Sequence, residues 1–341
     1  MIQAGADNAW PLLDVFPKLG QRLAPVSLCD LPTAVQPMSA LGKQAWVKRD
    51  DLTHKCYGGN KTRKFEFIAA EVLAKNRKHV VTLGGTGTNH GVATAMVCQQ
   101  LGLKSTVITF HQPNSAFVKK NQSLMKYFGA KVINAGPIAL AALRFYLNPC
   151  RLHKDYYFLP GGGAVPVATL SYINAAFELK RQIDNQQCPE PVEIYLPVGS
   201  ASTLAGLTLG CALAGMKTKV IGIQVLDSHM GPIETCTESV VKKLMSQALD
   251  ILTQEYPQAL KGLPNVILRA DYFAPGYGVL TPATTKAIAK GQDLGLTLDQ
   301  TYSGKAFDAY CQAIKISSKP ILYWATYNSN PEPAGLSEAT P

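Results

Sequence analysis

Short apolar runs rich in β-branched residues alternate along the chain with longer stretches whose apolar residues recur at the spacing of helices. Each run leads through a turn into a helical stretch, so the chain repeats one strand–turn–helix unit. The runs that predict strands are 80–83, 105–110, 131–134, 156–159, 192–196, 220–225 and 321–324, with a further strand near residue 45. This alternation predicts an α/β fold with parallel sheets, helices on both faces and ligands at the carboxyl ends of strands.

The order of these units predicts two lobes. Residues 62–165 hold four consecutive strand–helix units and are expected to form a smaller domain around one sheet. Residues 1–61 and 166–328 supply the remaining strands and are expected to form a larger domain, so the chain crosses between the lobes twice. Residues 329–341 contain three prolines and are expected to form a loose tail.

Composition narrows the class of protein. The 341 residues are 47% hydrophobic and 16% charged, which fits a globular protein long enough for two buried cores. The first twenty residues lack the pattern of a secretory signal, and the apolar run 204–216 is too short to cross a bilayer. The eight cysteines form no CxxC pair, so neither a zinc site nor a disulfide framework is expected. We therefore expect a soluble protein of the cytoplasm with no membrane partner and no metal.

The formal net charge of +10 raises the question of nucleic-acid binding. The basic residues are spread along the chain, and no aromatic RNA-binding motif, zinc finger or basic arm accompanies them. The charge is better explained by a surface that attracts small anions, and nucleic acid is not an expected partner.

The segment 58–64, GGNKTRK, opens a predicted helix. The two glycines permit a close backbone approach, and Asn60 is a candidate for capping the helix start. Lys61 and Lys64 lie three residues apart and share a helix face. A solvated basic helix start is one interpretation. The other is a desolvated lysine, because burial lowers the pKa of an ammonium group and frees the amine to bond an aldehyde.

Two further turns connect a strand to a helix and carry small polar residues. In the first, Thr88 or Asn89 can cap the helix that follows, and the free backbone NH groups favour a carboxylate or phosphate. His90 beside them is, taken alone, more often a structural residue than a catalyst. The second turn predicts a phosphate site, although it does not match the nucleotide P-loop pattern. Its residues are Gly199, Ser200, Ala201, Ser202 and Thr203.

Taken in order, these segments resemble the D-cysteine desulfhydrase and 1-aminocyclopropane-1-carboxylate deaminase family of pyridoxal-phosphate enzymes. The resemblance runs from VKRDDL at 47–52 through GGNKTRKFEF, the turn at 88–90 and LPGGG at 159–163. It continues through the 197–207 loop, PGYG at 275–278 and LDQTYSGKA at 298–306, and covers nearly the whole chain to about residue 328. The segment GGNKTRK is the most specific of these.

This resemblance implies a two-domain αβα fold of the tryptophan-synthase-β type, fold type II, with pyridoxal 5'-phosphate in the interdomain cleft. The larger domain would bind the cofactor phosphate. Lys61 matches the lysine that bonds the cofactor, and Lys64 matches a lysine near its phosphate. The 199–203 loop matches the phosphate cradle, and Thr326 matches a residue close to the pyridine nitrogen.

The resemblance also assigns the substrate side. Asn89 matches an asparagine beside the pyridine hydroxyl, and Thr88 stands where the family has a serine near the substrate carboxylate. Together with His90, these residues are expected to bind substrate. Tyr277 and Tyr302 match the two active-site tyrosines and are expected to be catalytic, with Lys61. The expected partners are a small amino-acid substrate and a second copy of the chain in a homodimer.

Some positions depart from the family pattern. The phosphate loop reads GSAST in place of a glycine-richer GSGGT, and Tyr327-Asn328 replaces a Gly-Gly pair. Ser303 follows Tyr302 where the cyclopropane deaminases tend to carry a glutamate near the ring nitrogen. The sequence therefore favours D-cysteine desulfhydrase activity, which yields pyruvate, ammonia and hydrogen sulfide.

Several alternatives stay open. One is 1-aminocyclopropane-1-carboxylate deaminase activity, which yields 2-oxobutanoate and ammonia. Racemase or dehydratase activity on a D-amino acid is another enzymatic interpretation. A protein that binds the cofactor or an amino acid but has lost catalysis is the alternative of a different class.

Overall fold

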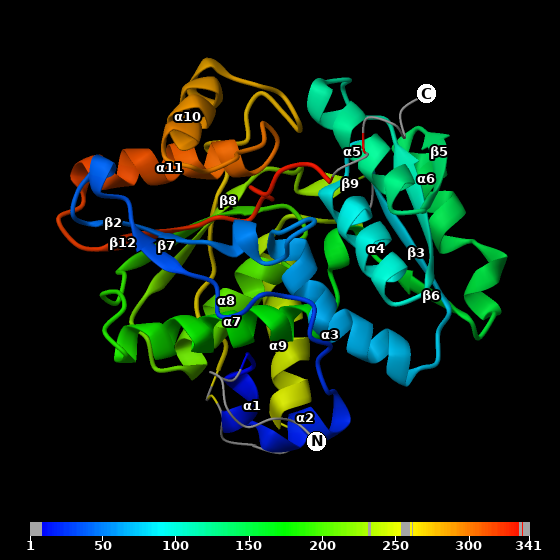
Figure 1. Ribbon diagram of the computed structural model, residues 1–341, viewed down its shortest axis with the longest axis horizontal. Coiled ribbons are helices and arrows are strands. Elements are labelled where there is room, and N and C mark those ends of the chain that lie inside the picture. The colour runs from blue at the N-terminus through cyan, green and yellow to red at the C-terminus, as the bar shows by residue number, and fades with distance from the viewer. Residues whose placement is uncertain (1–8, 231–232, 254–259, 261, 334–335, 337–341) are drawn as a thin grey trace.

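Two separate sheets organise the molecule (Figure 1). The computed structural model describes residues 9–230, 233–253, 260, 262–333 and 336. The smaller sheet has four parallel strands in the order β5–β4–β3–β6. Its strands are β3 (His79–Gly85), β4 (Lys104–Phe110), β5 (Lys131–Gly136) and β6 (Tyr156–Leu159).

The larger sheet has six strands in the order β1–β2–β12–β7–β8–β11. All neighbours pair in parallel except β1, which pairs antiparallel with β2 at the edge. Its strands are β1 (Val35–Pro37), β2 (Ala45–Lys48), β7 (Glu193–Val198), β8 (Lys219–Gln224), β11 (Ile267–Arg269) and β12 (Ile321–Trp324). A separate hairpin joins β9 (His229–Met230) to β10 (Ile233–Glu234).

Helices cover both faces of the larger sheet. Alternate side chains along β7 and β8 enter two different cores, as the two-residue period of a strand requires. The core on one face includes residues of α7 (Pro166–Asp184), α8 (Ser202–Leu213) and α9 (Glu238–Thr253). The core on the other face includes residues of α10 (Pro282–Asp293) and α11 (Ser303–Ile316). The sheet is therefore the middle layer of a three-layer arrangement.

The smaller sheet is also covered on both sides. Val80 and Val107 face the core shared with α4 (Asn89–Gln100) and α5 (Ala116–Tyr127), whereas Val81 and Ile108 face α6 (Ile138–Tyr146). Helix α3 (Asn60–Ala74) packs against α4 and α7 and so links the two sheets. The remaining helices are α1 (Leu12–Val15), α2 (Pro17–Arg22) and the short 3-10 turns Ser39–Leu41, Asp50–Leu52, Pro149–Leu152 and Gly161–Gly163.

A buried ionic cluster holds α3 against the larger sheet. The Arg63 guanidinium donates to Asp50 at 2.6 Å and to Glu178 at 2.9 Å, and Lys48 donates to Glu178 at 2.5 Å. Tyr172 and Trp324 donate to the second oxygen of Asp50. All these side chains are buried, and such charges are tolerated only when their hydrogen bonds are made. The cluster fixes the first turn of α3, which carries Lys61.

The strands predicted from the sequence are confirmed, together with their division between two sheets. The antiparallel strand β1 and the short strand β11 were not predicted. The numbered domain boundaries stay a prediction. Of the tail, Ser329 and Asn330 make hydrogen bonds, to the backbone NH of Thr297 and the backbone oxygen of His54, whereas 334–335 and 337–341 lie outside the described residues.

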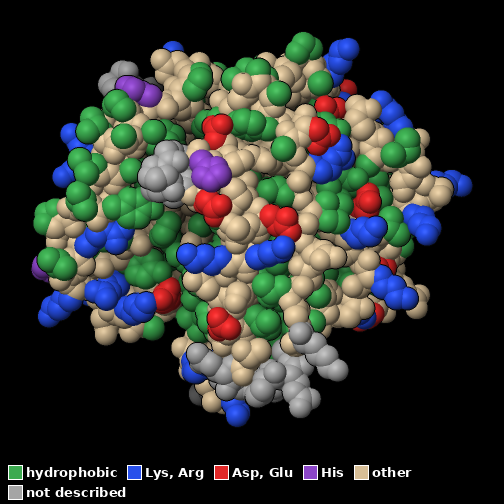
Figure 2. All heavy atoms as spheres, turned by 180° about the vertical axis from the view of Figure 1, so that it is seen from behind, with side chains coloured by type: hydrophobic (Ala, Val, Ile, Leu, Met, Phe, Trp, Pro, Cys, Tyr) green, Lys and Arg blue, Asp and Glu red, His purple; other side chains and the backbone are tan. Residues whose placement is uncertain are grey.

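Among the described residues, neither the distribution of charged side chains nor the cysteines indicate a further binding site. On the face shown in Figure 2, Lys and Arg side chains are spread among acidic and apolar ones. The eight cysteines are all free thiols. Within the described residues no helix is long and apolar enough to span a membrane, and no group of three or more His, Cys, Asp or Glu side chains could hold a metal ion.

Candidate active site

Elements from both sheets meet at one cavity. It lies at the carboxyl ends of β3 and β7 and at the amino ends of α3, α4 and α8, where a parallel α/β fold binds its ligands. Of the residues predicted from the sequence, those that line it are Lys61, Thr88, Asn89, His90, Gly199, Ser200, Ala201, Thr203, Tyr277, Tyr302 and Thr326. Lys64 and Ser202 do not line it.

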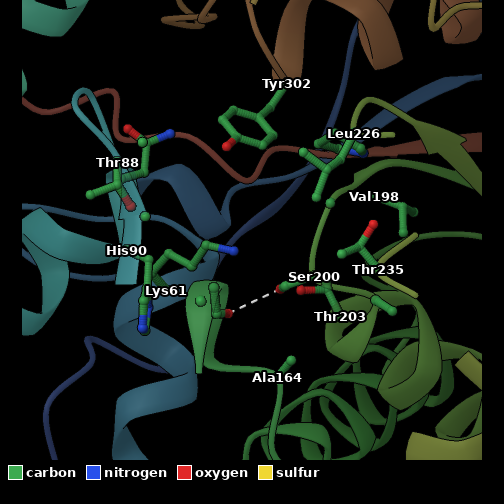
Figure 3. Close-up of a pocket in the computed structure, with 18 of the residues that line it drawn as sticks. Lys61, Thr88, His90, Ala164, Val198, Ser200, Thr203, Leu226, Thr235 and Tyr302 are labelled. Carbon is green, nitrogen blue, oxygen red and sulfur yellow. Dashed lines mark hydrogen bonds between the residues drawn. The ribbon is translucent and has the colours of Figure 1, made fainter. Parts of the chain in front are cut away.

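Lys61 is the second residue of α3, directly after a tight backbone approach. Gly59 has φ of +106°, and a Cβ there would lie 2.6 Å from the carbonyl oxygen of Thr326, so only glycine fits. Figure 3 shows the Lys61 side chain reaching into the space between Tyr302 and the Ser200–Thr203 loop. Burial lowers the pKa of the Lys61 amine to about 8, although Lys64 and Asp299 oppose this shift. A substantial fraction of the amine is therefore neutral near neutral pH.

Lys64 lies one turn further along the same helix. Its Nζ is 3.4 Å from both the carbonyl oxygen of Gly162 and the Oγ of Ser200. Burial, and next the charge of Lys61, lower the pKa of Lys64 well below its ordinary value. Lys64 thus bridges the Gly161–Gly163 turn and the 199–203 loop from behind the cavity wall.

The 199–203 loop leads into α8 without a side-chain cap. Ala201 occupies the N-cap position with φ of +63°, and its methyl group cannot accept the hydrogen bonds that a capping hydroxyl would. Among the described residues, the Ser202 NH donates to the carbonyl oxygen of Ser200 at 2.8 Å, which leaves the NH groups of Thr203 and Leu204 for an anion, and the helix dipole favours one. The Thr203 hydroxyl accepts a bond from the Asn60 amide at 3.1 Å, which leaves its proton free to donate.

The two serines of this loop behave differently. The Ser200 hydroxyl faces the cavity and donates to the carbonyl oxygen of Gly162 at 3.0 Å, the bond dashed in Figure 3. The Ser202 hydroxyl is fully buried and lies 3.4 Å from the carbonyl oxygen of Gly163. The Ser200 hydroxyl can therefore donate to a bound phosphate only if the phosphate replaces Gly162 as its acceptor. Ser202 does not line the cavity, and its NH is bonded to the carbonyl oxygen of Ser200.

The start of α4 supplies the opposite wall. Thr88 caps this helix, because its hydroxyl accepts the backbone NH of Gly91 at 3.2 Å. The Asn89 side-chain oxygen accepts from the Tyr57 hydroxyl at 3.0 Å and from the Asn121 amide at 2.7 Å. The His90 ring stacks on Phe65 and points away from Tyr302 (Figure 3). Burial, followed by the charges of Lys61 and Lys64, lowers the pKa of His90 well below its ordinary value, so the ring is neutral.

Two tyrosines form a hydroxyl pair in the cavity. The hydroxyls of Tyr277 and Tyr302 are 2.6 Å apart. Burial raises the pKa of Tyr277 to about 12, and the hydrogen bond from Tyr302 partly offsets that rise. Burial raises the pKa of Tyr302 further, and the Tyr277 charge adds to this. Either hydroxyl can donate to the other, and both tyrosines line the cavity.

The residue after Tyr302 does not line the cavity. The Ser303 hydroxyl is fully buried and donates to the Asp299 carboxylate at 2.7 Å. Asp299 in turn accepts the backbone NH groups of Thr301, Tyr302 and Ser303, so it holds the first turn of α11. Thr326, which the family resemblance matches to a residue near the ring nitrogen, does line the cavity. Its hydroxyl carries no charge.

One prediction about local structure is wrong. Asn60 does not cap α3, because the helix begins at Asn60 itself and the N-cap position is Gly59, which has no side chain to accept a bond. The Asn60 amide instead reaches across to Thr203. The family departure at 327–328 also has a structural use. Asn328 accepts the backbone NH of Gly58 at 2.7 Å, and Tyr327 packs against Phe117 at the cavity wall.

Some residues at the cavity or behind its wall were not predicted from the sequence. Tyr57 and Asn121 hold Asn89, and Asp299 holds the turn of Tyr302. The tyrosine beside the GG turn was a detectable signal, whereas Asn121 stands in the middle of a helix where nothing marks it. Other lining residues outside the predicted motifs are Phe110, Tyr146, Leu226, Glu234, Thr235 and Val240.

Comparison with known proteins agrees with this arrangement. Residues 26–326 match the family described as pyridoxal-phosphate dependent enzymes. The chain belongs to this family and has its type II fold, so it is an enzyme whose cofactor is pyridoxal phosphate.

Among its relatives are a putative 1-aminocyclopropane-1-carboxylate deaminase of Pyrococcus abyssi, 32% identical over 78% of each chain, and a D-cysteine desulfhydrase of Klebsiella pneumoniae. The latter is 30% identical over 90% of this chain and 93% of its own. The crystal structure of an ACC deaminase homologue covers 91% of this chain and 93% of its own, with a TM-score of 0.77 and 27% identity.

The cavity residues fit the cofactor. An aldehyde needs a desolvated amine, which Lys61 supplies, and a phosphate needs the uncapped start of a long helix, which α8 supplies. These two features face the same cavity (Figure 3).

Proposed function

We propose that this protein is a D-cysteine desulfhydrase, a pyridoxal-phosphate enzyme that converts D-cysteine and water to pyruvate, ammonia and hydrogen sulfide. The observation that carries the proposal is a Lys61 amine with a pKa of about 8, in a cavity that also contains an uncapped helix start and a buried tyrosine pair. When bound, the cofactor serves as an electron sink for charge at the substrate α-carbon.

Lys61 has two roles in this proposal. It holds the cofactor covalently until a substrate amine displaces it, and the released amine then takes the proton from the α-carbon. Because its pKa is lowered to about 8, the amine accepts and returns protons near physiological pH. A lysine with an ordinary pKa would be charged and unable to act as a base.

The tyrosine pair supplies a proton to the leaving group. Breaking the Cβ–S bond releases a thiolate, which needs a proton. Tyr277 is the proposed donor, because its hydroxyl faces the cavity and its partner Tyr302 stabilises the resulting charge through their 2.6 Å contact. In this proposal Tyr302 positions Tyr277 and keeps its own proton.

The remaining groups bind and orient. Thr203, Ser200 and the NH groups of Thr203 and Leu204 would hold the phosphate. Its negative charge would favour the charged form of Lys64 behind the loop, against the burial that lowers the pKa of this lysine. Thr88 and its helix start would bind the substrate carboxylate. His90, which is neutral and stacked on Phe65, would support this wall rather than exchange protons.

The expected substrate follows from Thr326, the residue that the resemblance matches to the pyridine nitrogen, because this residue carries no charge. Thr326 is a hydroxyl, so it gives the ring nitrogen less support as a cation than a carboxylate would. Expelling a thiolate needs less assistance than opening a cyclopropane ring. We therefore expect kcat/KM for sulfide release from D-cysteine to exceed that for 2-oxobutanoate release from 1-aminocyclopropane-1-carboxylate by at least about tenfold, or about 1.4 kcal/mol.

Two experiments test the proposal. The purified protein, given pyridoxal phosphate, should turn yellow, and borohydride should fix the cofactor on Lys61; label on another lysine would refute the site. The loaded enzyme is then assayed for keto acid and sulfide with D-cysteine, L-cysteine, D-serine and 1-aminocyclopropane-1-carboxylate. Faster release from the cyclopropane substrate would make the deaminase the correct function. A yellow protein with no product from any substrate would favour the binding protein that has lost catalysis.

The assembly and location belong to the same proposal. We propose a cytoplasmic homodimer, which light scattering of the purified enzyme and fractionation of its host cells would test.

A further inference from the structure

The side chain of Asn89 is held by two partners that lie outside the predicted motifs. Tyr57 lies just before α3, and Asn121 lies in the middle of α5. Each is 32 residues from Asn89 along the chain. Asn121 is fully buried. Both partners contact the same atom, the Asn89 side-chain oxygen.

The backbone determines which way the Asn121 amide faces. Its Nδ2 lies 2.8 Å from the carbonyl oxygen of Gly87, which can only accept a hydrogen bond. Turning the amide over would place two oxygens against each other. The same Nδ2 lies 2.7 Å from Asn89, so the Asn89 atom that faces it must be the acceptor Oδ1. The Asn121 Oδ1 is buried and has no hydrogen-bond partner among the described residues.

This chain of contacts has a consequence for the cavity. Because Oδ1 of Asn89 is occupied by Asn121 and Tyr57, its NH2 group is the part left for a ligand. Burial raises the pKa of Tyr57 well above its ordinary value, so Tyr57 stays a neutral donor. A ligand at Asn89 must therefore present an acceptor.

We propose that Asn121 and Tyr57 are positioning residues that fix the Asn89 amide with its NH2 toward the cofactor ring oxygen. The inference rests on the proposed cofactor site, since it takes Lys61 as the attachment point. Asn121 and Tyr57 touch neither cofactor nor substrate in this proposal and act only through Asn89. A donor at this place stabilises negative charge on the ring oxygen and so lowers the pKa of the neighbouring lysine–cofactor nitrogen.

The test compares cofactor binding in single and double variants of the full chain. Asn89→Ala removes the donor and should raise the dissociation constant of pyridoxal phosphate about tenfold. Asn121→Leu should approach that value. Asn121→Asp should be at least as harmful, because an acid at 121 attracts the Asn89 NH2 and turns its oxygen toward the ring. Tyr57→Phe, which loses one hydroxyl, should cost about threefold.

The decisive measurement is the double variant. If Asn121 acts through Asn89, Asn121→Leu should change affinity by less than about twofold when Asn89 is already Ala. A second readout is the pH titration of the visible absorption band, whose midpoint should rise by about one pH unit in Asn121→Leu. Ser115→Ala is the matched control, because it removes the cap of α5 without touching Asn89 and should move neither quantity.

The outcomes separate this inference from the proposed function. Additive losses in the double variant, or a Ser115→Ala effect as large as that of Asn121→Leu, would overturn the positioning role. Should Asn121→Leu fail to fold, an unchanged affinity and titration in Tyr57→Phe and Asn121→Asp would overturn it equally. If the unmodified protein forms no covalent bond between cofactor and Lys61, the proposed function fails and takes the inference with it.

Discussion

Two helices begin at the same cavity, and their first turns differ. Helix α4 begins with a threonine hydroxyl that accepts one of its own NH groups, from Gly91. Helix α8 begins with Ala201, whose methyl group accepts nothing. At α4 the side-chain hydroxyl is thus already used within the helix, whereas at α8 the Ser202 NH bonds the backbone oxygen of Ser200 and the Thr203 hydroxyl keeps its proton for a ligand. The difference predicts that the phosphate binds at α8 and that the less demanding carboxylate binds at α4.

The two starts also differ in how they are supported. The α4 start is held by hydrogen bonds of its own side chains to Tyr57, Asn121 and the backbone. The α8 start is held by groups from elsewhere, with Asn60 on Thr203 and Lys64 on Ser200. Both of these come from α3, the helix that carries Lys61. In the proposed site, phosphate binding and covalent attachment of the cofactor would therefore be coupled through the first turn of α3.

The largest expected effect on this difference comes from a variant that places a carboxylate at the start of α8. Thr203→Asp keeps an acceptor for the Asn60 amide but adds negative charge at the helix start. We expect the affinity for pyridoxal phosphate to fall about 100-fold, or about 2.7 kcal/mol, while the unliganded protein gains about 0.3–1 kcal/mol from the helix dipole. Thr203→Val, which loses both the donor and the acceptor of the Asn60 amide but adds no charge, should cost about tenfold. Equilibrium titration and urea unfolding measure the two quantities.

Pyridoxal without its phosphate provides the control for this prediction. Its weaker binding should be nearly equal in Thr203→Asp and the unmodified protein, because it brings no anion to α8. A loss of pyridoxal affinity as large as that for pyridoxal phosphate would mean that the variant damages the cavity in general.

The next effect concerns the chemistry at α3 and is set by pH. The pKa of Lys61 is lowered from 10.5 to about 8, and only the neutral amine attacks an aldehyde. The rate of covalent cofactor capture should therefore rise about tenfold from pH 7 to pH 9 and level off above pH 8. Stopped-flow absorbance at fixed cofactor concentration measures it. A rate that keeps rising to pH 10 would indicate an ordinary, solvated lysine.

A smaller effect is expected when the α4 cap is removed. Thr88→Val has nearly the same shape but cannot accept the Gly91 NH, so stability to urea should fall by about 1 kcal/mol. Cofactor affinity should change less than threefold, in contrast to the α8 variants, while KM for the amino acid rises. Thr281→Val is the control, because Thr281 caps α10 in the same way and does not line the cavity. It should lose similar stability with KM unchanged.

The sequence predicted the fold where strands are buried. Strands β3, β4, β7 and β8 are buried over most of their length and rich in apolar and β-branched residues because helices cover both of their faces, and this made them detectable. Strands β1 and β11 have three residues each, and none of those residues is fully buried, so no comparable run marks them. The place of β1 depends on its antiparallel pairing with the nearby β2, and that of β11 on pairing with β8, which is distant in sequence.

The site was predictable to the extent that it is local. The turns around Lys61, Asn89 and Thr203 are each marked in the sequence by glycines and small polar residues, and the structure brings all of them to one cavity. Their chemical roles stay predictions. The pairing of Asn121 with Asn89 joins two helices, and the capture of Ser303 by Asp299 depends on the bend before α11. The first contact is set by tertiary packing and leaves no pattern along the chain, whereas the second is local and depends on the conformation of one turn.

The smallest effect concerns the backbone of the α8 start itself. Ala201 has φ of +63° and ψ of −30°, a conformation that costs a residue with a Cβ about 1–3 kcal/mol and glycine much less. Ala201→Gly relieves this strain but adds freedom to the unfolded chain, worth about 0.4–1 kcal/mol. The difference should be a net stabilisation of about 0.5–1 kcal/mol, measured by urea unfolding without cofactor. Ala164→Gly in the same cavity is the control, because Ala164 has an ordinary φ of −80° and should lose about 0.4–1 kcal/mol. Equal destabilisation by both substitutions would show that position 201 carries no strain and that the α8 start differs from the α4 start only in its missing cap.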